Sequence, residues 1–279
     1  MTVPLSDGRE VRVHDSGSPG DGAGDAALAL LWHHGSPQTG ALLAPLVEQA
    51  AARRIRLMSY ARPSYGGSTP RPGRTVASAA EDVAAVMDAL GVRRFATMGA
   101  SGGGPHALAC AALLGERVVG AVTLAGLAPF TEAVDWFAGM AAPGALHAAR
   151  EGREARARFA ETDTFDATQF TAADWAALSG PWSALGADAG RADAAGPDGL
   201  IDDDVAFAAP WGFDLAAITA PVLLVQGGED RVVPAAHAHL LLASLPGAEL
   251  WLRPRDGHVS VLRATAVAMD WLLDRAAPA

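Results

Sequence analysis

The chain is short of cysteine and of basic residues, and both shortages limit what it can be. Among its 279 residues Cys110 is the only cysteine, so no disulfide can form within the chain. The 21 basic residues are outnumbered by 31 acidic ones, which gives a formal net charge of −10. Nucleic acids and anionic membrane surfaces are bound through clustered lysine and arginine, and the sequence has no dense basic run. We therefore expect neither as a partner.

Targeting and membrane-spanning patterns are also missing. Residues 1–10 lack the basic-then-apolar layout of a signal peptide. No apolar stretch approaches the roughly 18 residues of a membrane span. The candidate stretch 118–130 is too short, and its pattern is typical of a buried strand that leads into a loop. These observations predict a cytoplasmic protein. Its composition, 50% hydrophobic and 19% charged, is that of a globular chain able to bury a large core.

Strand-like and helix-like segments alternate along most of the chain. The pattern predicts an N-terminal hairpin with its second strand at 11–14, and a loop over 16–25. Further strands are expected at 27–32, 55–60, 95–98, 119–124, 221–226 and 249–253, and helices near 41–53, 77–90, 105–114, 234–245 and 260–275. Ser78 and Glu81 predict a capping box at the start of the second helix. Because the strands are apolar on both faces, the pattern predicts an α/β fold with a mostly parallel, doubly wound sheet.

Residues 131–214 interrupt this alternation. They show short helix-like pieces and no strand pattern, and they contain four of the seven tryptophans: Trp136, Trp175, Trp182 and Trp211. We expect a helical lid inserted into a core domain formed by 1–130 and 215–279. Such lids exclude water and shape a substrate pocket. Trp136, Trp175 and Trp182 are therefore candidate substrate-binding residues, with packing inside the lid as the alternative for each of them.

A serine surrounded by glycines carries the strongest chemical signal. Gly99-Ala100-Ser101-Gly102-Gly103 lies between a strand-like run and a helix-like run. This is the setting of a nucleophile elbow, a sharp turn that exposes the serine hydroxyl above the sheet edge. Cys110, in the helix that follows, is expected to be a buried apolar residue. We predict Ser101 as the catalytic nucleophile.

A serine nucleophile needs a base that is itself oriented by an acid. Reactive groups gather at the carboxyl ends of parallel strands, so we searched the segments that follow each strand. Asp230 follows the strand at 221–226, and His258 follows the last strand. We predict His258 as the base and Asp230 as the acid, with Glu229 and Asp256 as the neighbouring alternatives for the acid.

Backbone amides are needed to stabilise the negative oxygen that develops during acyl transfer. The N–H of Gly102, directly after the nucleophile, is one expected donor. The N–H of Ser36, in the loop after the strand at 27–32, is the other. His34 is expected to anchor this loop, with proton transfer as the alternative for its imidazole. His33 and His34 are also candidate substrate-binding residues.

These motifs together resemble the α/β-hydrolase fold superfamily over essentially the whole chain. The resemblance rests on His34-Gly35-Ser36-Pro37, Tyr60 to Ser68, the elbow, Gly227 to Asp230, and Gly257-His258. One departure concerns the second motif, where Ala61 and Ser64 replace the usual acidic residue and first glycine. The altered motif is expected to change the shape of the pocket. A serine at the elbow argues against the dehalogenase and epoxide hydrolase relatives, which use a carboxylate nucleophile.

We expect a serine hydrolase that cleaves a small carboxylic ester or lactone through an acyl-enzyme, with a small molecule as partner and no cofactor. One alternative is an amidase or aminopeptidase similar to proline iminopeptidases, in which Glu132, Glu151, Glu154 or Glu161 would hold the substrate amine. A non-hydrolytic cyclase or acyltransferase, or a ligand-binding protein, is another. Asp202-Asp203-Asp204 is assigned to the N-terminus of a short helix, and no metal site is expected. The sequence leaves the formation of a homo-oligomer open.

Overall fold

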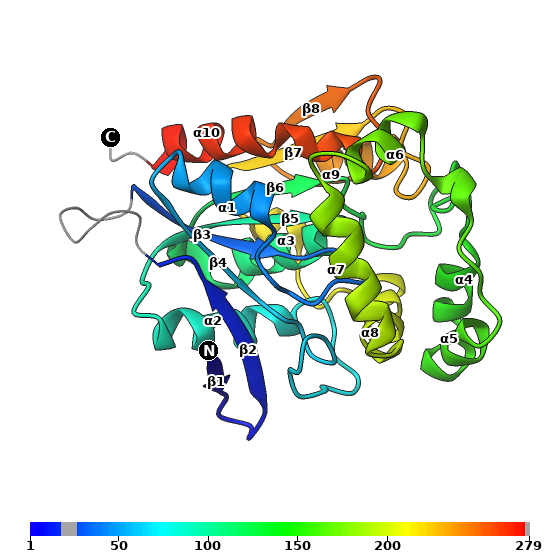
Figure 1. Ribbon diagram of the computed structural model, residues 1–279, viewed down its shortest axis with the longest axis horizontal. Coiled ribbons are helices and arrows are strands. Elements are labelled where there is room, and N and C mark those ends of the chain that lie inside the picture. Colours follow the sequence, from blue (N-terminus) through cyan, green and yellow to red (C-terminus); the bar gives the residue numbers. More distant parts are fainter. Residues whose placement is uncertain (18–26, 277–279) are drawn as a thin grey trace.

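The computed structural model describes residues 1–17 and 27–276, and within them the strands form one eight-stranded sheet in the order β1-β2-β4-β3-β5-β6-β7-β8 (Figure 1). β1 pairs antiparallel with β2, and β2 with β4, whereas all pairs from β4 to β8 are parallel. The predicted mostly parallel sheet is therefore confirmed. The strands are β1 (Thr2–Pro4), β2 (Glu10–Asp15), β3 (Leu28–His33), β4 (Ile55–Tyr60), β5 (Phe95–Ala100), β6 (Val118–Leu124), β7 (Val222–Gly227) and β8 (Glu249–Arg253).

Helices cover both faces of the sheet, which is why its central strands are apolar on both sides. Every residue of β5 and of β7 is buried. Adjacent residues such as Leu30 and Leu31 enter different hydrophobic clusters, one on each face. Helices α2 (Ser78–Ala89), α3 (Gly103–Leu113) and α9 (Ala235–Ser244) contribute to one cluster, and α1 (Ala44–Ala51) and α10 (Thr265–Ala276) to the other.

Between β6 and β7 the chain forms only helices, turns and loops, as expected for residues 131–214, which we call the helical segment. Figure 1 shows its helices together beyond one end of the sheet, on the right of the view. They are α4 (Gly144–Arg150), α5 (Arg153–Ala160), α6 (Ala172–Leu178), α7 (Ser183–Ala194) and α8 (Asp198–Ala208). In the parts of the chain that the structure describes, no helix is long and apolar enough to cross a membrane.

One local prediction is wrong and one cannot be compared. The residue that caps α2 is Ala77, and Ser78 accepts a hydrogen bond from the N–H of Thr75 instead of forming a capping box with Glu81. The helix predicted near 260–275 is present, with its first turn a 3₁₀ helix, Ser260–Ala264, that leads directly into α10. Most of the loop predicted over 16–25 lies outside the described residues.

The glycines around β5 let helix α3 approach the sheet closely. A Cβ at Gly99 would overlap the carbonyl of Gly103, and a Cβ at Gly103 would overlap the carbonyl of His33. Backbone atoms cannot move aside as a flexible side chain can, so neither position has room for a side chain.

We expect Gly99→Ala to destabilise the protein by about 3 kcal/mol, because the added methyl group has no space to enter. Gly190→Ala is the matched control, since a Cβ there meets no atom within 4 Å and the residue lies inside α7. This control should be stabilised by up to about 1 kcal/mol through helix propensity. Urea unfolding measures both values, and equal stabilities for the two variants would contradict the packing argument.

Candidate active site

Ser101 occupies a strained turn between β5 and α3. Its φ angle is +51°, a value that residues with a side chain rarely adopt. The turn is held in place because the Ser101 N–H donates to the Leu124 carbonyl at 2.8 Å and its own carbonyl accepts from the Gly104 N–H at 2.9 Å. Strain of this kind clusters at functional sites. The side chain stays partly exposed at the carboxyl end of the central strand.

Asp230 and His258 form a hydrogen-bonded pair at the ends of β7 and β8. The distance from His258 Nδ1 to Asp230 Oδ2 is 2.8 Å. The other carboxylate oxygen of Asp230 accepts from the N–H groups of Val232 and Val233 at 2.9 and 2.8 Å. Gln226 donates to Oδ2 from the end of β7 at 3.3 Å. These bonds fix the carboxylate, so that it can orient the imidazole and leave its Nε2 free to take a proton.

The alternative acids lie elsewhere. Asp256 forms its ion pairs with Arg253 and Arg263, and Glu229 is exposed. Of the three acidic residues considered from the sequence, the structure therefore pairs Asp230 with the histidine.

Charge holds the pKa of His258 above its ordinary value. Burial by itself would lower this pKa, but the negative charge of Asp230 and its hydrogen bond outweigh burial, and Asp174 contributes in the same direction. The folded protein therefore favours the protonated ring. The pair stabilises the fold below the ordinary histidine pKa of about 6.5, and that contribution is lost as the pH rises through the pKa of His258.

Asp174 is a site residue that the sequence reasoning missed. It lies on α6 and its side chain is fully buried. One carboxylate oxygen accepts from the N–H groups of Val259 and Ser260, at 2.9 and 2.7 Å, and the other from Thr171. Asp174 thus ties the helical segment to the loop that carries His258. The capping pattern Thr171-x-x-Asp174 is visible in the sequence. The sequence does not show that Asp174 also accepts hydrogen bonds from the backbone of Val259 and Ser260.

The amides of Ser36 and Gly102 are available as donors to an oxyanion. Among the described residues, neither N–H donates to a protein acceptor. A Cβ at Gly35, next to Ser36, would lie 3.7 Å from the Ser101 Cβ, so this loop borders the elbow. Gly102 packs so closely against the Ser36 hydroxyl and the Phe207 ring that it has no room for a side chain.

Arg62, which follows β4, holds the loop that contains Ser36. Its guanidinium donates to the carbonyls of His34 and Gly35 at 2.5 and 3.2 Å. His34 donates from Nδ1 to the Gly35 carbonyl at 2.7 Å, and its Nε2 accepts from the Arg62 N–H at 3.2 Å. His34 therefore lies in the anchoring position predicted for it, and burial holds its pKa well below the ordinary value.

His33 does not face an open cavity. Its ring is 1% exposed and lies against Tyr60 and His106, with its Nε2 3.7 Å from the Cys110 sulfur. Cys110 is buried as predicted, and burial raises its pKa above the ordinary thiol value. The neighbouring His106 donates from Nδ1 to the Gly102 carbonyl at 2.7 Å, and burial with nearby positive charge lowers its pKa to about 3.

The three tryptophans considered for substrate binding lie in different surroundings. Trp136 and Trp182 are each 2% exposed: Trp136 packs against Phe130, Phe137 and His237, and Trp182 belongs to the cluster that contains Val259. Both are packed, but against the clusters that cover the sheet and not, as the sequence alternative had it, within the helical segment alone. Trp175 is 41% exposed and contacts Phe165 and Phe170 at the surface.

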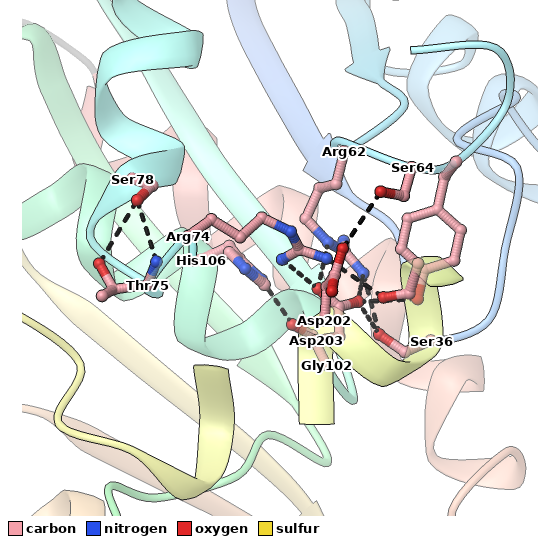
Figure 2. A network of polar contacts seen from close by, with 12 residues as sticks. Ser36, Arg62, Ser64, Arg74, Thr75, Ser78, Gly102, His106, Asp202 and Asp203 are labelled. Atoms are coloured by element: carbon pink, nitrogen blue, oxygen red, sulfur yellow. Dashed lines mark hydrogen bonds and ion pairs between the residues drawn. The ribbon is translucent and has the colours of Figure 1, made fainter. Parts of the chain in front are cut away.

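The run Asp202-Asp203-Asp204 was assigned to the wrong position. It lies in the middle of α8, not at a helix N-terminus, and all three residues are buried. Each forms an ion pair: Asp202 with Arg153, Asp203 with Arg62 and Arg74, and Asp204 with Arg156. Figure 2 shows Asp203 between Arg62 and Arg74, beside Ser36. In the described ranges 1–17 and 27–276, no group of three or more His, Cys, Asp or Glu residues is arranged to hold a metal ion.

The glutamates considered for an aminopeptidase lie at the surface. All four of them are exposed: Glu132, Glu151, Glu154 and Glu161. Glu154 pairs with Arg158 one turn along the same helix, and Glu132 approaches Arg150. The structure therefore offers no support for these residues as an amine-binding group.

Comparisons with known proteins agree with the fold described above. The family model of the alpha/beta hydrolase fold matches residues 29–264. A search of curated proteins finds no match to the chain.

Several solved structures share the fold along nearly the whole chain. An esterase from Thermogutta terrifontis is 20% identical with a TM-score of 0.72, and the alignment covers 99% of both chains. The enol-lactonase from Burkholderia xenovorans LB400 is 20% identical with a TM-score of 0.71, over 98% of both chains. A bromoperoxidase from Bacillus anthracis is 18% identical with a TM-score of 0.72, over 98% of this chain and 99% of its own. At these identities the likeness shows the fold alone.

The ring of His258 should titrate above the ordinary value of about 6.5, because the charge of Asp230 favours its protonated form. Asp230→Asn removes that charge and should lower the midpoint. Asp256→Asn, two residues from the histidine, should leave the midpoint unchanged because its carboxylate pairs with arginines. NMR of the ring protons as a function of pH measures the midpoint of His258 in the parent and in both variants. A larger shift in Asp256→Asn than in Asp230→Asn would refute the pairing.

Proposed function

Because the chain belongs to the alpha/beta hydrolase fold family, we propose that it is a serine hydrolase that cleaves a small carboxylic ester or lactone. The observation that carries this proposal is the combination of Ser101, strained at φ +51°, with the Asp230–His258 hydrogen bond at the same sheet edge. The free amides of Gly102 and Ser36 support it further. The esterase and the enol-lactonase that share the fold are named for the same class of bond cleavage.

In the proposed first half-reaction, Ser101 Oγ attacks the carbonyl carbon of the substrate while its proton passes to Nε2 of His258. The negative charge moves to the former carbonyl oxygen, where the N–H groups of Gly102 and Ser36 donate to it. When this tetrahedral intermediate collapses, the bond to the leaving oxygen breaks. His258 gives its proton to that oxygen, and the acyl group remains on Ser101.

In the second half-reaction, water replaces the leaving alcohol. His258 takes a proton from the water, and the hydroxide attacks the acyl carbon. Collapse of the second tetrahedral intermediate releases the carboxylic acid and returns the proton to Ser101. For a lactone, the alcohol and the acid are two ends of the same product.

The helical segment is proposed to act as a lid that limits the size of the substrate. Its α8 places the ring of Phe207, 2% exposed, against Gly102 and 5.7 Å from the ring of His106. An apolar ring at this position excludes water from the space beside the elbow, which strengthens the hydrogen bonds to a developing oxyanion.

A fluorophosphonate should label the protein on Ser101 and abolish its turnover of esters or lactones. Ser101→Ala should lose the label and at least about 10⁴-fold in turnover, because the acyl-enzyme can no longer form. Ser244→Ala, at the end of α9, is the control that should keep both. Mass spectrometry locates the label, and a panel of esters, lactones and aminoacyl amides identifies the substrate class. Full activity in Ser101→Ala would exclude the mechanism.

A further inference from the structure

Asp203 connects α8 with the loop that carries Ser36. Its side chain is completely buried, although it belongs to the helical segment and its partners follow the strands of the sheet. Oδ2 accepts from Ser36 Oγ at 2.5 Å, from Arg62 Nη2 at 2.6 Å and from the Tyr65 hydroxyl at 3.0 Å. Oδ1 accepts from Arg74 at 2.6 Å. The contacts are drawn in Figure 2.

The position of Arg62 determines where the Ser36 N–H points. In a trans peptide the C=O and the N–H lie on opposite sides, so the direction of the Gly35 carbonyl sets that of the Ser36 N–H. This carbonyl accepts from both His34 Nδ1 and Arg62 Nη2. The Ser36 N–H is thereby directed away from Arg62. Arg62 Nη2 also donates to Ser36 Oγ at 2.9 Å, so Asp203, Arg62 and Ser36 form a closed set of hydrogen bonds.

Charge gives this arrangement its rigidity. Two buried guanidinium groups, those of Arg62 and Arg74, share the one carboxylate of Asp203. Burial by itself would favour the neutral acid, but the two positive charges hold the pKa of Asp203 well below its ordinary value. The carboxylate therefore remains charged, and charge-assisted hydrogen bonds of this kind are short and strong.

The same face of α8 reaches the second oxyanion donor. Phe207 lies four residues after Asp203, one helical turn further on, so both side chains project from one side of the helix. Phe207 packs against Gly102 while Asp203 binds Ser36. One helix of the segment therefore contacts both residues whose amides are available.

We infer that Asp203 is a positioning residue for the oxyanion site, through which the docked helical segment orients the Ser36 N–H for catalysis. This inference rests on the proposed serine hydrolase function. If α8 moves away, the enzyme lacks one fixed oxyanion donor and is slow even with substrate bound. The carboxylate of Asp203 would then couple the docking of α8 over the substrate to the rate of the reaction.

The test compares Asp203→Asn with Asp204→Asn. Both variants remove a buried aspartate charge from α8, but Asp204 pairs with Arg156 inside the helical segment, at 2.7 Å. Asp203→Asn should lose about 10²-fold in kcat, the effect of losing one oxyanion donor, with KM changed by less than about threefold. Asp204→Asn should melt at a lower temperature and keep kcat within about twofold of the parent.

A boronic acid inhibitor provides a second readout, because its tetrahedral oxygen occupies the oxyanion site. Its affinity should fall in Asp203→Asn in parallel with kcat and stay unchanged in Asp204→Asn. If Asp203→Asn only melts earlier, with the parent's kcat and boronate affinity, Asp203 is a structural residue and the inference is wrong.

Ser36→Ala keeps the inference falsifiable if Asp203→Asn does not fold. This change keeps the backbone N–H and all charges but removes the hydroxyl that binds Asp203, and it should lower kcat by about tenfold with an unchanged KM. Parental kcat in Ser36→Ala overturns the inference whether or not Asp203→Asn folds. A parent protein that neither turns over esters or lactones nor reacts with a fluorophosphonate overturns the proposed function and the inference together. An active parent with equally active variants overturns the inference alone.

Discussion

The close approach of helix α3 to the ends of β3 and β5 is the constraint on which the site depends. The helix can approach only because Gly99 and Gly103 have no side chains, since a Cβ on either would overlap a carbonyl group. Ser101 is held between them in a left-handed backbone conformation that costs energy by itself. Packing of α3 against the sheet offsets that cost. The loop that contains Ser36 borders this turn, and the Asp230–His258 pair lies at the ends of β7 and β8, at the same edge of the sheet.

Buried charged groups hold the helical segment against the sheet. The helical segment is fastened to the sheet by buried aspartates, with Asp174 bound to the backbone after His258 and Asp203 bound to Arg62 and Arg74. A buried charge is costly unless it is paired and hydrogen-bonded, so such contacts tolerate little displacement. The segment therefore has a well-defined docked position, in contrast to a cover that is held by apolar packing alone.

Features that depend on spacing along the chain could be predicted from the sequence, whereas features that depend on contacts between distant segments could not. The sharp turn at Ser101, the alternation of strands and helices, and the placement of Asp230 and His258 after neighbouring strands all follow from local patterns. The capping box at Ser78 and Glu81 was wrong because the residue that caps α2 is Ala77. The assignment of Asp202 to Asp204 to a helix end was wrong because α8 begins earlier, at Asp198. The propensity of a few residues does not fix where a helix starts.

By itself the sequence determined the α/β fold and the residues that end up beside the carboxyl ends of the strands, because hydrophobic periodicity and parallel topology leave few alternatives. It could not choose among Asp230, Glu229 and Asp256 by contact, nor show that Trp136 and Trp182 are packed inside the fold. It also gave no sign that Asp174 and Asp203 reach from the helical segment to the strand ends. Only the tertiary structure decided these points. A buried charge is paired with whichever partner the packing of distant segments brings within hydrogen-bond distance, and that partner cannot be read from neighbouring residues.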